Sequence, residues 1–286
     1  SGSGRFRVAI TGERIMRIKA VEGPEKTVIR GESDPDHLGD ADYPGCGANA
    51  VQCVLYAAGS YGFQLQGFTL ADGRSMGGGA AVYANIGGAY RFWLDDCIVT
   101  NCVAFRGGGV YWARVVNSIL CGNTCCYIGG AMEGGKIYGS LVYGNKAFFP
   151  YLAAHRGCYD LKHANHTTFF DHLHIDSGWT TFINCLFYKV YMPNATPQVF
   201  HNVFSATSGV DVNKFPADSG NYVVEDENLA YDENYRPIVG HNEAIDFGSI
   251  AASETEPDFL SGPDVLGGQR ISNGTIDVGA LEADWR

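Results

Sequence analysis

Short runs of Val, Ile, Phe and Tyr alternate with glycine and asparagine along most of the chain. Four of these segments align without gaps: Cys97–Cys102, Ser118–Asn123, Ser140–Asn145 and Cys185–Tyr188. Ile98 and Ile119 are 21 residues apart, and Ile119 and Leu141 are 22 apart. The step from Leu141 to Leu186 is 45 residues, or two such periods, with 168–170 as the candidate for the missing copy. The chain therefore carries an internal repeat of about 22 residues.

Clusters of glycine recur along the chain with the same period as the aligned segments. Gly77–Gly79 precede Val82, Gly107–Gly109 precede Val110, and Gly129–Gly130 precede Met132. Runs of three to five β-branched and aromatic residues between glycines are typical of strands, because glycine takes the positive φ values of tight corners. One such unit cannot bury its own apolar face, so successive units are expected to stack as turns of a coil. No segment shows sustained helical periodicity.

Small polar residues also fall into columns of this repeat. Cys97, Ser118, Ser140 and Cys185 share one position, and Asn123 and Asn145 share another with Cys102. Asparagine side chains stacked at a corner can hydrogen-bond to one another along the coil. We interpret these columns as ladders rather than as catalytic residues.

Two terminal segments stand apart from the repeat. Ser1–Gly4 looks like a cloning remnant and is left out of fold reasoning. We expect coils over 5–205, interrupted by a projecting loop at 147–164, and an irregular C-terminal section over 206–286 that covers the last turn. The repeat length predicts roughly eight to ten turns.

Composition narrows the class of function. The net charge of -11 argues against nucleic acid as a partner, because phosphate binding needs clustered Lys and Arg. No run of 18 apolar residues is present, so no transmembrane helix is expected. The nine cysteines are an odd number, and most lie in strand-like runs as small apolar residues. A disulfide between Cys46 and Cys53 is one possibility left open.

The C-terminal motifs suggest a family. Tyr235–Ile238, Glu243–Gly248 and Asp277–Glu282 (sequence DVGALE) resemble elements of secreted bacterial proteins of the choice-of-anchor Q type. Together with the glycine-rich repeats, they resemble the right-handed parallel β-helices of the pectate-lyase-like superfamily and the polymorphic outer-membrane repeats. The resemblance implies an extracellular or bacterial cell-envelope protein, but no activity, since this fold hosts many functions. The family's N-terminal cap is missing, so a truncated chain or a first turn completed from elsewhere is expected.

Histidines concentrate between 155 and 174, where the repeat is interrupted. We consider His155, Arg156, Lys162, His163 and His166 as candidate catalytic residues. A polysaccharide lyase needs a base for the proton next to the uronate carboxylate and a cation to stabilise the resulting charge. Clustered histidines would make activity change between about pH 5 and 8. The alternative is a polar loop without a catalytic role.

Two further groups suggest ligands. Asp34, Asp36 and Asp40 lie in an acidic segment that could bind calcium, although a solvated loop is the simpler interpretation. Asp171 and His174, with His172, are an alternative set of ligands for a transition metal. Tyr83 and Tyr111 occupy the same repeat position, with Trp112 next to Tyr111. Exposed rings in a column can stack on sugars, but packing explains them equally well. Alternation predicts that only one of Tyr111 and Trp112 faces out.

Two functions follow as expectations. The first is a secreted or cell-surface carbohydrate-active protein, with a polysaccharide lyase acting on an acidic glycan, or a glycoside hydrolase, as the enzyme activities considered. The second is a non-catalytic scaffold or adhesin that binds glycan or another envelope component.

Overall fold

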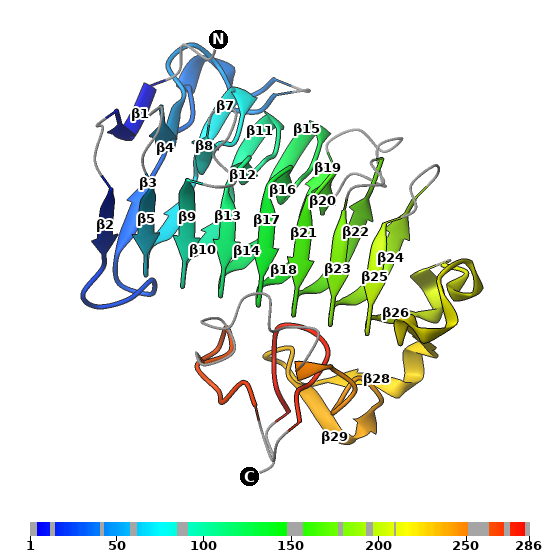
Figure 1. The fold of residues 1–286 in the computed structure, drawn as a ribbon. Coiled ribbons are helices and arrows are strands. Elements are labelled where there is room, and N and C mark those ends of the chain that lie inside the picture. The colour runs from blue at the N-terminus through cyan, green and yellow to red at the C-terminus, as the bar shows by residue number, and fades with distance from the viewer. Residues whose placement is uncertain are drawn as a thin grey trace.

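The computed structural model describes residues 5–11, 15–40, 43–57, 62–84, 91–147, 157–176, 180–192, 197–208, 210–250, 263–271 and 275–283. Short strands follow one another around a coil whose turns stack in parallel, and the coil runs from left to right in Figure 1. The predicted parallel β-helix is confirmed. We number its four faces in the order in which the chain crosses them.

The strands of each face pair in parallel along the coil axis. Face 1 contains β1 (Arg5–Ile10), β4 (Val51–Tyr56), β8 (Val82–Ala84), β12 (Val110–Tyr111), β16 (Met132–Glu133), β20 (Cys158–Tyr159) and the second halves of β22 (Thr168–His174) and β24 (Leu186–Tyr191). Face 2 contains β2 (Met16–Lys19), β5 (Phe63–Gln66), β9 (Phe92–Asp95), β13 (Arg114–Val116), β17 (Lys136–Tyr138), β21 (His163–Asn165), β23 (Thr181–Ile183) and β25 (Gln198–Phe200).

The remaining strands complete each turn. Face 3 contains β3 (Val28–Arg30), β6 (Thr69–Ala71), β10 (Ile98–Thr100), β14 (Ile119–Cys121), β18 (Leu141–Tyr143), the first halves of β22 and β24, β26 (Val203–Ser205) and β27 (Tyr222–Val224). Face 4 contains β7 (Arg74–Gly78), β11 (Val103–Arg106), β15 (Thr124–Ile128) and β19 (Lys146–Ala147). Face 2 is an eight-stranded sheet, in keeping with the expected eight to ten turns.

The observed register reproduces the sequence repeat. Ile119 pairs with both Ile98 and Leu141, and Leu141 pairs with Thr168. Thr168 pairs in turn with Leu186, so 168–170 is the missing copy of the repeat. Like residues therefore stack on like residues along the axis.

Positive φ angles at the corners explain the glycine and asparagine content. The corner between faces 2 and 3 has such an angle at Gly67, Asp96, Asn117, Gly139, His166, Asn184 and His201. The corner between faces 3 and 4 repeats it at Asp72, Asn101, Gly122 and Gly144. Glycine adopts this left-handed region without cost, and Asn and Asp tolerate it better than other residues. A repeated corner therefore favours Gly, Asn or Asp, and histidine takes the same position at 166 and 201.

The predicted ladders form inside the coil. The Asn123 and Asn145 amides are 3.0 Å apart, and Asn145 Nδ2 donates to Asp171 at 2.8 Å. In the small-residue column, the Cys97 backbone N–H donates to Ser118 Oγ and the Ser118 N–H donates to Ser140 Oγ. These bonds satisfy buried backbone groups that the sharp corners leave without a strand partner.

The nine cysteines are all free thiols, so the disulfide considered between Cys46 and Cys53 is not formed. The Cys46 thiol points to the carbonyl of Val103 at 3.5 Å, and the Cys53 thiol points to that of Ala71 at 3.3 Å. Eight of the nine are buried, which keeps them from oxidants in solution. The thiols act here as small apolar side chains.

The prediction of a projecting loop at 147–164 is wrong for residues 157–164. Cys158 pairs with Met132 on face 1, and His163 pairs with Lys136 on face 2. This segment continues the coil because its inward-facing residues Cys158, Leu161 and Ala164 are apolar and fully buried in the core. Residues 148–156 lie outside the described residues.

The C-terminal section covers both the end and the side of the coil (Figure 1). After β26, the ring of Phe215 stacks on that of Phe204, with centroids 6.1 Å apart, and closes the interior of the last turn. The chain then forms the antiparallel pair β28 (Leu229–Tyr231) and β29 (Pro237–Asn242). Beyond it, the backbone N–H of Ala280 donates to Thr168 on the side of the coil. The section therefore contacts more of the coil than the last turn that the sequence predicts it to cover.

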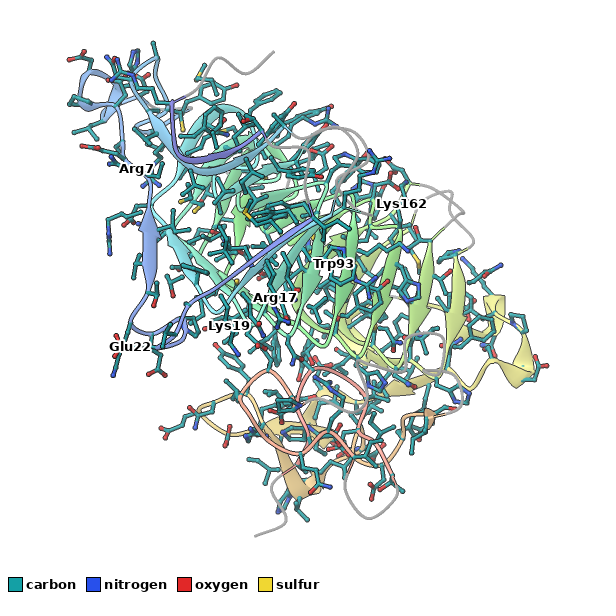
Figure 2. The ribbon with its side chains drawn as sticks, turned by 60° about the vertical axis from the view of Figure 1, so that its left-hand side comes forward. Arg7, Arg17, Lys19, Glu22, Trp93 and Lys162 are labelled. Atoms are coloured by element: carbon teal, nitrogen blue, oxygen red, sulfur yellow. The ribbon has the colours of Figure 1, made fainter. Side chains whose placement is uncertain are left out.

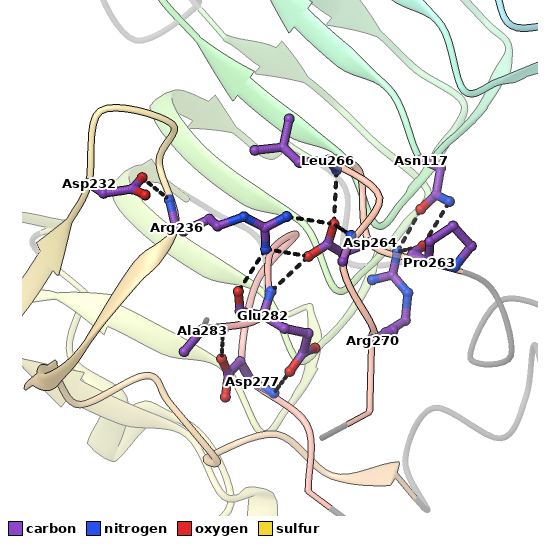
Figure 3. A network of polar contacts seen from close by, with 11 residues as sticks. Asn117, Asp232, Arg236, Pro263, Asp264, Leu266, Arg270, Asp277, Glu282 and Ala283 are labelled. Atoms are coloured by element: carbon purple, nitrogen blue, oxygen red, sulfur yellow. Dashed lines mark hydrogen bonds and ion pairs between the residues drawn. The ribbon is translucent and has the colours of Figure 1, made fainter. Parts of the chain in front are cut away.

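Buried charges hold the C-terminal section together and attach it to the coil (Figure 3). Arg236 Nη1 donates to Asp264 at 2.7 Å and to the carbonyl of Glu282 at 2.9 Å. Arg270 Nη2 donates to Asn117 Oδ1, a corner residue of the coil, at 2.6 Å. Burial raises the pKa of Asp277 to about 6 and that of Glu282 to about 9. No helix in the described part of the chain is both long and apolar enough to cross a membrane.

Candidate functional site

The predicted tyrosine column forms on the outside of face 1. Tyr83 and Tyr111 pair in register, and their rings stack with centroids 5.4 Å apart and planes 3° from parallel. Both rings are half-exposed. Trp112 is also half-exposed, because it lies at a corner with φ 55° and not in the strand. The prediction that only one of Tyr111 and Trp112 faces out is therefore wrong.

The same outward row continues past the two tyrosines with Glu133, Tyr159, His174 and Tyr191. We call this line of six residues the tyrosine row. The side chain of Glu133 is only 5% exposed, and its carboxylate accepts two hydrogen bonds from Arg106. Burial raises the pKa of Glu133 to about 7, although Arg106 favours the ionised form. The row therefore holds one carboxyl group able to exchange a proton near neutral pH.

A pocket of about 160 Å³ lies beside the stacked tyrosines. Its lining includes Phe6, Gln52, Tyr83, Phe105, Arg106 and Tyr111. Gly78 also lines the pocket and lets the Tyr111 ring lie against the backbone, because a Cβ at this position would be 2.9 Å from the ring. Aromatic faces with a guanidinium at one side suit a small ring-shaped ligand that carries polar or anionic groups.

Cationic and aromatic side chains form a second row, on face 2. Register places Arg17, Gln64, Trp93, Arg114, Lys136 and His163 on six successive strands, all pointing outward. The guanidinium of Arg114 lies over two rings, 4.8 Å from the centroid of Trp93 and 4.4 Å from that of Tyr138. Figure 2 shows Arg17 and Trp93 on this face of the molecule. We call these six residues the face 2 row.

Lys162 lies between the two rows, at the corner of faces 1 and 2. Its ammonium is 2.8 Å from the carboxylate of Asp160 and 5.8 Å from the centroid of the Trp112 ring. Trp112 lies against the backbone of Gly134, where a Cβ would meet the indole at 2.6 Å. The corner therefore joins the tyrosine row to the face 2 row through an aromatic ring and a cation.

The candidate catalytic residues do not form one patch. Lys162 and His163 are adjacent and half-buried on the outside of the coil. His166 is fully buried, with its Nε2 3.0 Å from the amide of Asn184. Burial and the nearby Arg270 hold the pKa of His166 well below its usual range. A polymer cannot reach His166, so its predicted catalytic role is not supported. His155 and Arg156 lie outside the described residues.

The acidic segment has a structural role. Asp34 is buried, and its carboxylate accepts hydrogen bonds from the backbone N–H groups of Asp36 and Asn49 at 3.1 and 2.8 Å. Asp40 pairs with His37 at 2.7 Å. Among the described residues no three His, Cys, Asp or Glu side chains lie close enough to hold a metal ion. The predicted calcium site at Asp34, Asp36 and Asp40 is therefore not formed.

Several residues of the site were missed from the sequence. Trp93, Arg114 and Lys136 follow one another at 21 and 22 residues, which is the period of the apolar columns. Extending the repeat from the apolar positions to the charged ones would have found this part of the row.

A comparison with protein families and with curated proteins finds no match to this chain.

Proposed function

We propose that the protein is a carbohydrate-binding β-helix that holds a linear acidic glycan along the face 2 row. The observation that carries the proposal is the register of Arg17, Trp93, Arg114, Lys136 and His163 on one outward line. With Gln64 between Arg17 and Trp93, the line crosses six strands that lie one strand spacing apart. The distance from Arg17 to His163 along the line is therefore about 24 Å. A site of this shape suits an extended polymer better than a compact ligand.

The residue types match an acidic sugar. Aromatic rings pack against the apolar faces of sugar rings, and cations bind carboxylate or sulfate groups by charge-assisted hydrogen bonds. The chain as a whole carries a net charge of -11, so the row is a local positive region on an acidic protein. Such a region focuses an anionic ligand onto one face, and its effect weakens as salt increases.

The tyrosine row extends the surface around the corner. Tyr83 and Tyr111 offer two stacked rings beside the pocket that Arg106 lines. We assign to them the binding of a single sugar unit, with Trp112 and Lys162 linking this position to the face 2 row. The proposed substrate-binding residues thus include Tyr83, Tyr111 and Trp112, as predicted from the sequence.

A polysaccharide lyase is the second candidate, favoured by one observation. Arg114, Lys136 and His163 present a guanidinium, an amine and an imidazole on three consecutive strands. In this reaction, the imidazole or amine takes the proton next to the uronate carboxylate, and the guanidinium stabilises the negative charge that develops. The C–O bond of the glycosidic link then breaks, the leaving oxygen gains a proton, and an unsaturated sugar remains.

Binding to a panel of uronic-acid polysaccharides, measured by calorimetry at low salt, tests the first proposal. We expect Lys136→Ala to weaken binding about tenfold, since a charge-assisted hydrogen bond is worth roughly 1.5–3 kcal/mol. Lys146→Ala is the matched control, because Lys146 is exposed on face 4, away from the row. Equal binding by both variants, or none by the wild type, contradicts the proposal.

Ultraviolet absorbance of the unsaturated product separates the lyase from a binding protein. We expect a lyase to lose turnover in His163→Gln while keeping most of its affinity. If the wild type binds glycan and produces neither an unsaturated product nor new reducing ends, the protein is a non-catalytic scaffold or adhesin. From the resemblance of its repeats and C-terminal motifs, we propose that the protein is related to the pectate-lyase-like superfamily and acts outside the cell or at the bacterial cell surface.

A further inference from the structure

One guanidinium lies between the pocket of face 1 and a buried carboxylate. Arg106 lines this pocket beside the stacked rings of Tyr83 on β8 and Tyr111 on β12, in the N-terminal half of the coil (Figure 1). Its Nε and Nη2 atoms donate to the two carboxylate oxygens of Glu133, with Nε 2.8 Å from Oε2. The Glu133 side chain is 5% exposed, whereas that of Arg106 is 40% exposed. A buried anion therefore holds one edge of the guanidinium, and the other edge is left for a ligand.

The second edge of Arg106 can bind another carboxylate. Among the described residues, its Nη1 atom has no hydrogen-bond partner. A guanidinium has five N–H groups in one plane, of which Glu133 uses two, and its shape suits two-pronged binding of a carboxylate. The pocket holds about 160 Å³, and a cavity of about 150 Å³ is enough for one benzene ring. One six-membered ring that carries a carboxylate therefore matches the pocket in size and in charge.

Two carboxylates would then share one cation. While Glu133 is ionised, it forms a neutral pair with Arg106, and a ligand carboxylate adds an uncompensated negative charge. Once Glu133 is protonated, the ligand carboxylate becomes the counter-ion of Arg106, and the site is neutral again. Two carboxyl groups that share a site cannot both ionise easily, so one of them takes up a proton. That group is Glu133, because its burial makes ionisation more costly than it is for a ligand in an open pocket.

Glu133 is the group of this region that titrates near neutral pH. Its charged and titratable neighbours lie on four strands or directly after them: Arg106 of β11, Tyr111 of β12, Cys125 of β15, Tyr159 of β20 and Asp160. Burial raises the pKa values of the two tyrosines and of the cysteine, so these groups stay neutral near pH 7. Burial also raises the pKa of Glu133 to about 7, and the charge of Asp160 adds to this effect. Asp160 itself pairs with Lys162 at 2.8 Å.

We propose that the pocket binds the carboxylate of a single uronate unit through the second edge of Arg106, and that Glu133 takes up one proton from solution as the ligand binds. Arg106 contacts the ligand, and Glu133 is a positioning residue that acts through Arg106. The inference rests on the proposed binding of one sugar unit beside Tyr83 and Tyr111. It adds the charge of that unit and the dependence of its binding on pH.

Calorimetric titration with methyl glucuronoside, and with the uncharged methyl glucoside for comparison, tests the proposal. The glucuronoside should bind about tenfold more weakly at pH 8.5 than at pH 6, because above about pH 7 its binding requires proton uptake. Titrations at pH 8 in two buffers with different heats of ionisation should show an uptake of about one proton per ligand. At pH 6 the glucoside should bind at least tenfold more weakly than the glucuronoside, since it offers Arg106 no carboxylate.

Two variants separate the roles of the paired residues. Glu133→Gln keeps the shape of the protonated side chain and cannot ionise. It should bind the glucuronoside at pH 8.5 as tightly as the wild type does at pH 6, with no proton uptake. Adding Arg106→Gln to this variant removes the cation without leaving a buried charge, and should weaken binding at pH 6 at least tenfold. Lys146→Ala, on face 4, is the control that should keep the affinity and the pH dependence of the wild type.

Three results overturn the inference. They are a wild type that binds no glucuronoside at pH 6, a wild type that binds it equally at pH 6 and 8.5, and a Glu133→Gln variant that keeps the pH dependence. Equal binding of the glucuronoside and the glucoside likewise overturns the contact with Arg106. The face 2 row is tested separately, by polysaccharides and Lys136→Ala. A protein that binds the glucuronoside but no polysaccharide therefore keeps this pocket and loses the row.

Discussion

The two ends of the coil are built from the same strand stack but are finished differently. At the C-terminal end, Phe215 closes the interior over Phe204, and the buried pair of Arg236 and Asp264 holds the section that follows. At the N-terminal end, Ile18 and Val28 remain exposed, and the ion pair of Arg7 and Glu32 lies in solvent. The difference shows that a repeat specifies the coil and leaves its ends to other parts of the sequence.

The comparison also bears on stability. A stacked coil depends on contacts between neighbouring turns, so a turn with one neighbour is held less firmly than a turn with two. The C-terminal end compensates by docking non-repeating chain on the end and the side of the coil. The N-terminal end has no equivalent among the described residues. We therefore expect substitutions of similar chemistry to have larger effects at the C-terminal end.

The largest difference in the free energy of unfolding is expected between substitutions at two arginine–carboxylate ion pairs, one at each end of the coil. Arg236→Ala leaves the fully buried carboxylate of Asp264 without its cation, which costs about 3–5 kcal/mol. Arg7→Ala removes an exposed pair, worth about 0–1 kcal/mol. Chemical denaturation at pH 7 measures both. Equal effects would show that the C-terminal section adds little to the stability of the coil.

The pH dependence of stability provides the second test. The pKa of Glu282 is about 9 and that of Asp277 about 6 in the folded chain, against 4.5 and 3.8 ordinarily, because burial disfavours their ionised forms. Below about pH 3 both carboxyls are protonated in both states, so the contribution of these two groups to stability is then at its greatest. As pH rises the unfolded chain ionises first, and stability falls between about pH 4 and 9.

For Asp277 alone this loss is about 3 kcal/mol. Glu282→Gln, which keeps the shape of the protonated form, should flatten the dependence, as measured by denaturation from pH 4 to 9. Glu32→Gln, at the exposed N-terminal pair, is the control and should leave the slope unchanged. A slope that is the same in Glu282→Gln and the wild type contradicts the expected protonation of this network.

The sequence predicted the repeating part of the molecule and one part of the site. Columns of like residues gave the register, the ladders and the stacked pair of Tyr83 and Tyr111. The catalytic role predicted for His166 is not supported, because its burial depends on the C-terminal section, which contacts the coil more than a hundred residues away in sequence and follows no period. Arg114 and Lys136 are not part of any local cluster of charge, and only the spacing of the repeat relates them to each other.

The third test compares the terminal members of two inward stacks. Phe215 is the last ring over Phe204, and Met16 is the residue above Phe63 at the other end. Phe215→Ala should cost about 2 kcal/mol, less than a fully buried phenylalanine because the ring is half-exposed. Met16→Ala, at a side chain 45% exposed, should cost about 0.5 kcal/mol. A larger cost for Met16→Ala would show that the N-terminal end is covered in solution.

The smallest effect on the isolated chain is expected for Ile18→Ser. Ile18 is already 38% exposed, so at low protein concentration its replacement should change the free energy of unfolding by about 1 kcal/mol or less. Chemical denaturation of the wild type and of Ile18→Ser, side by side at pH 7, measures the change. A loss of more than about 2 kcal/mol would show that Ile18 is covered in the folded chain, and the N-terminal end would then be closed like the C-terminal end.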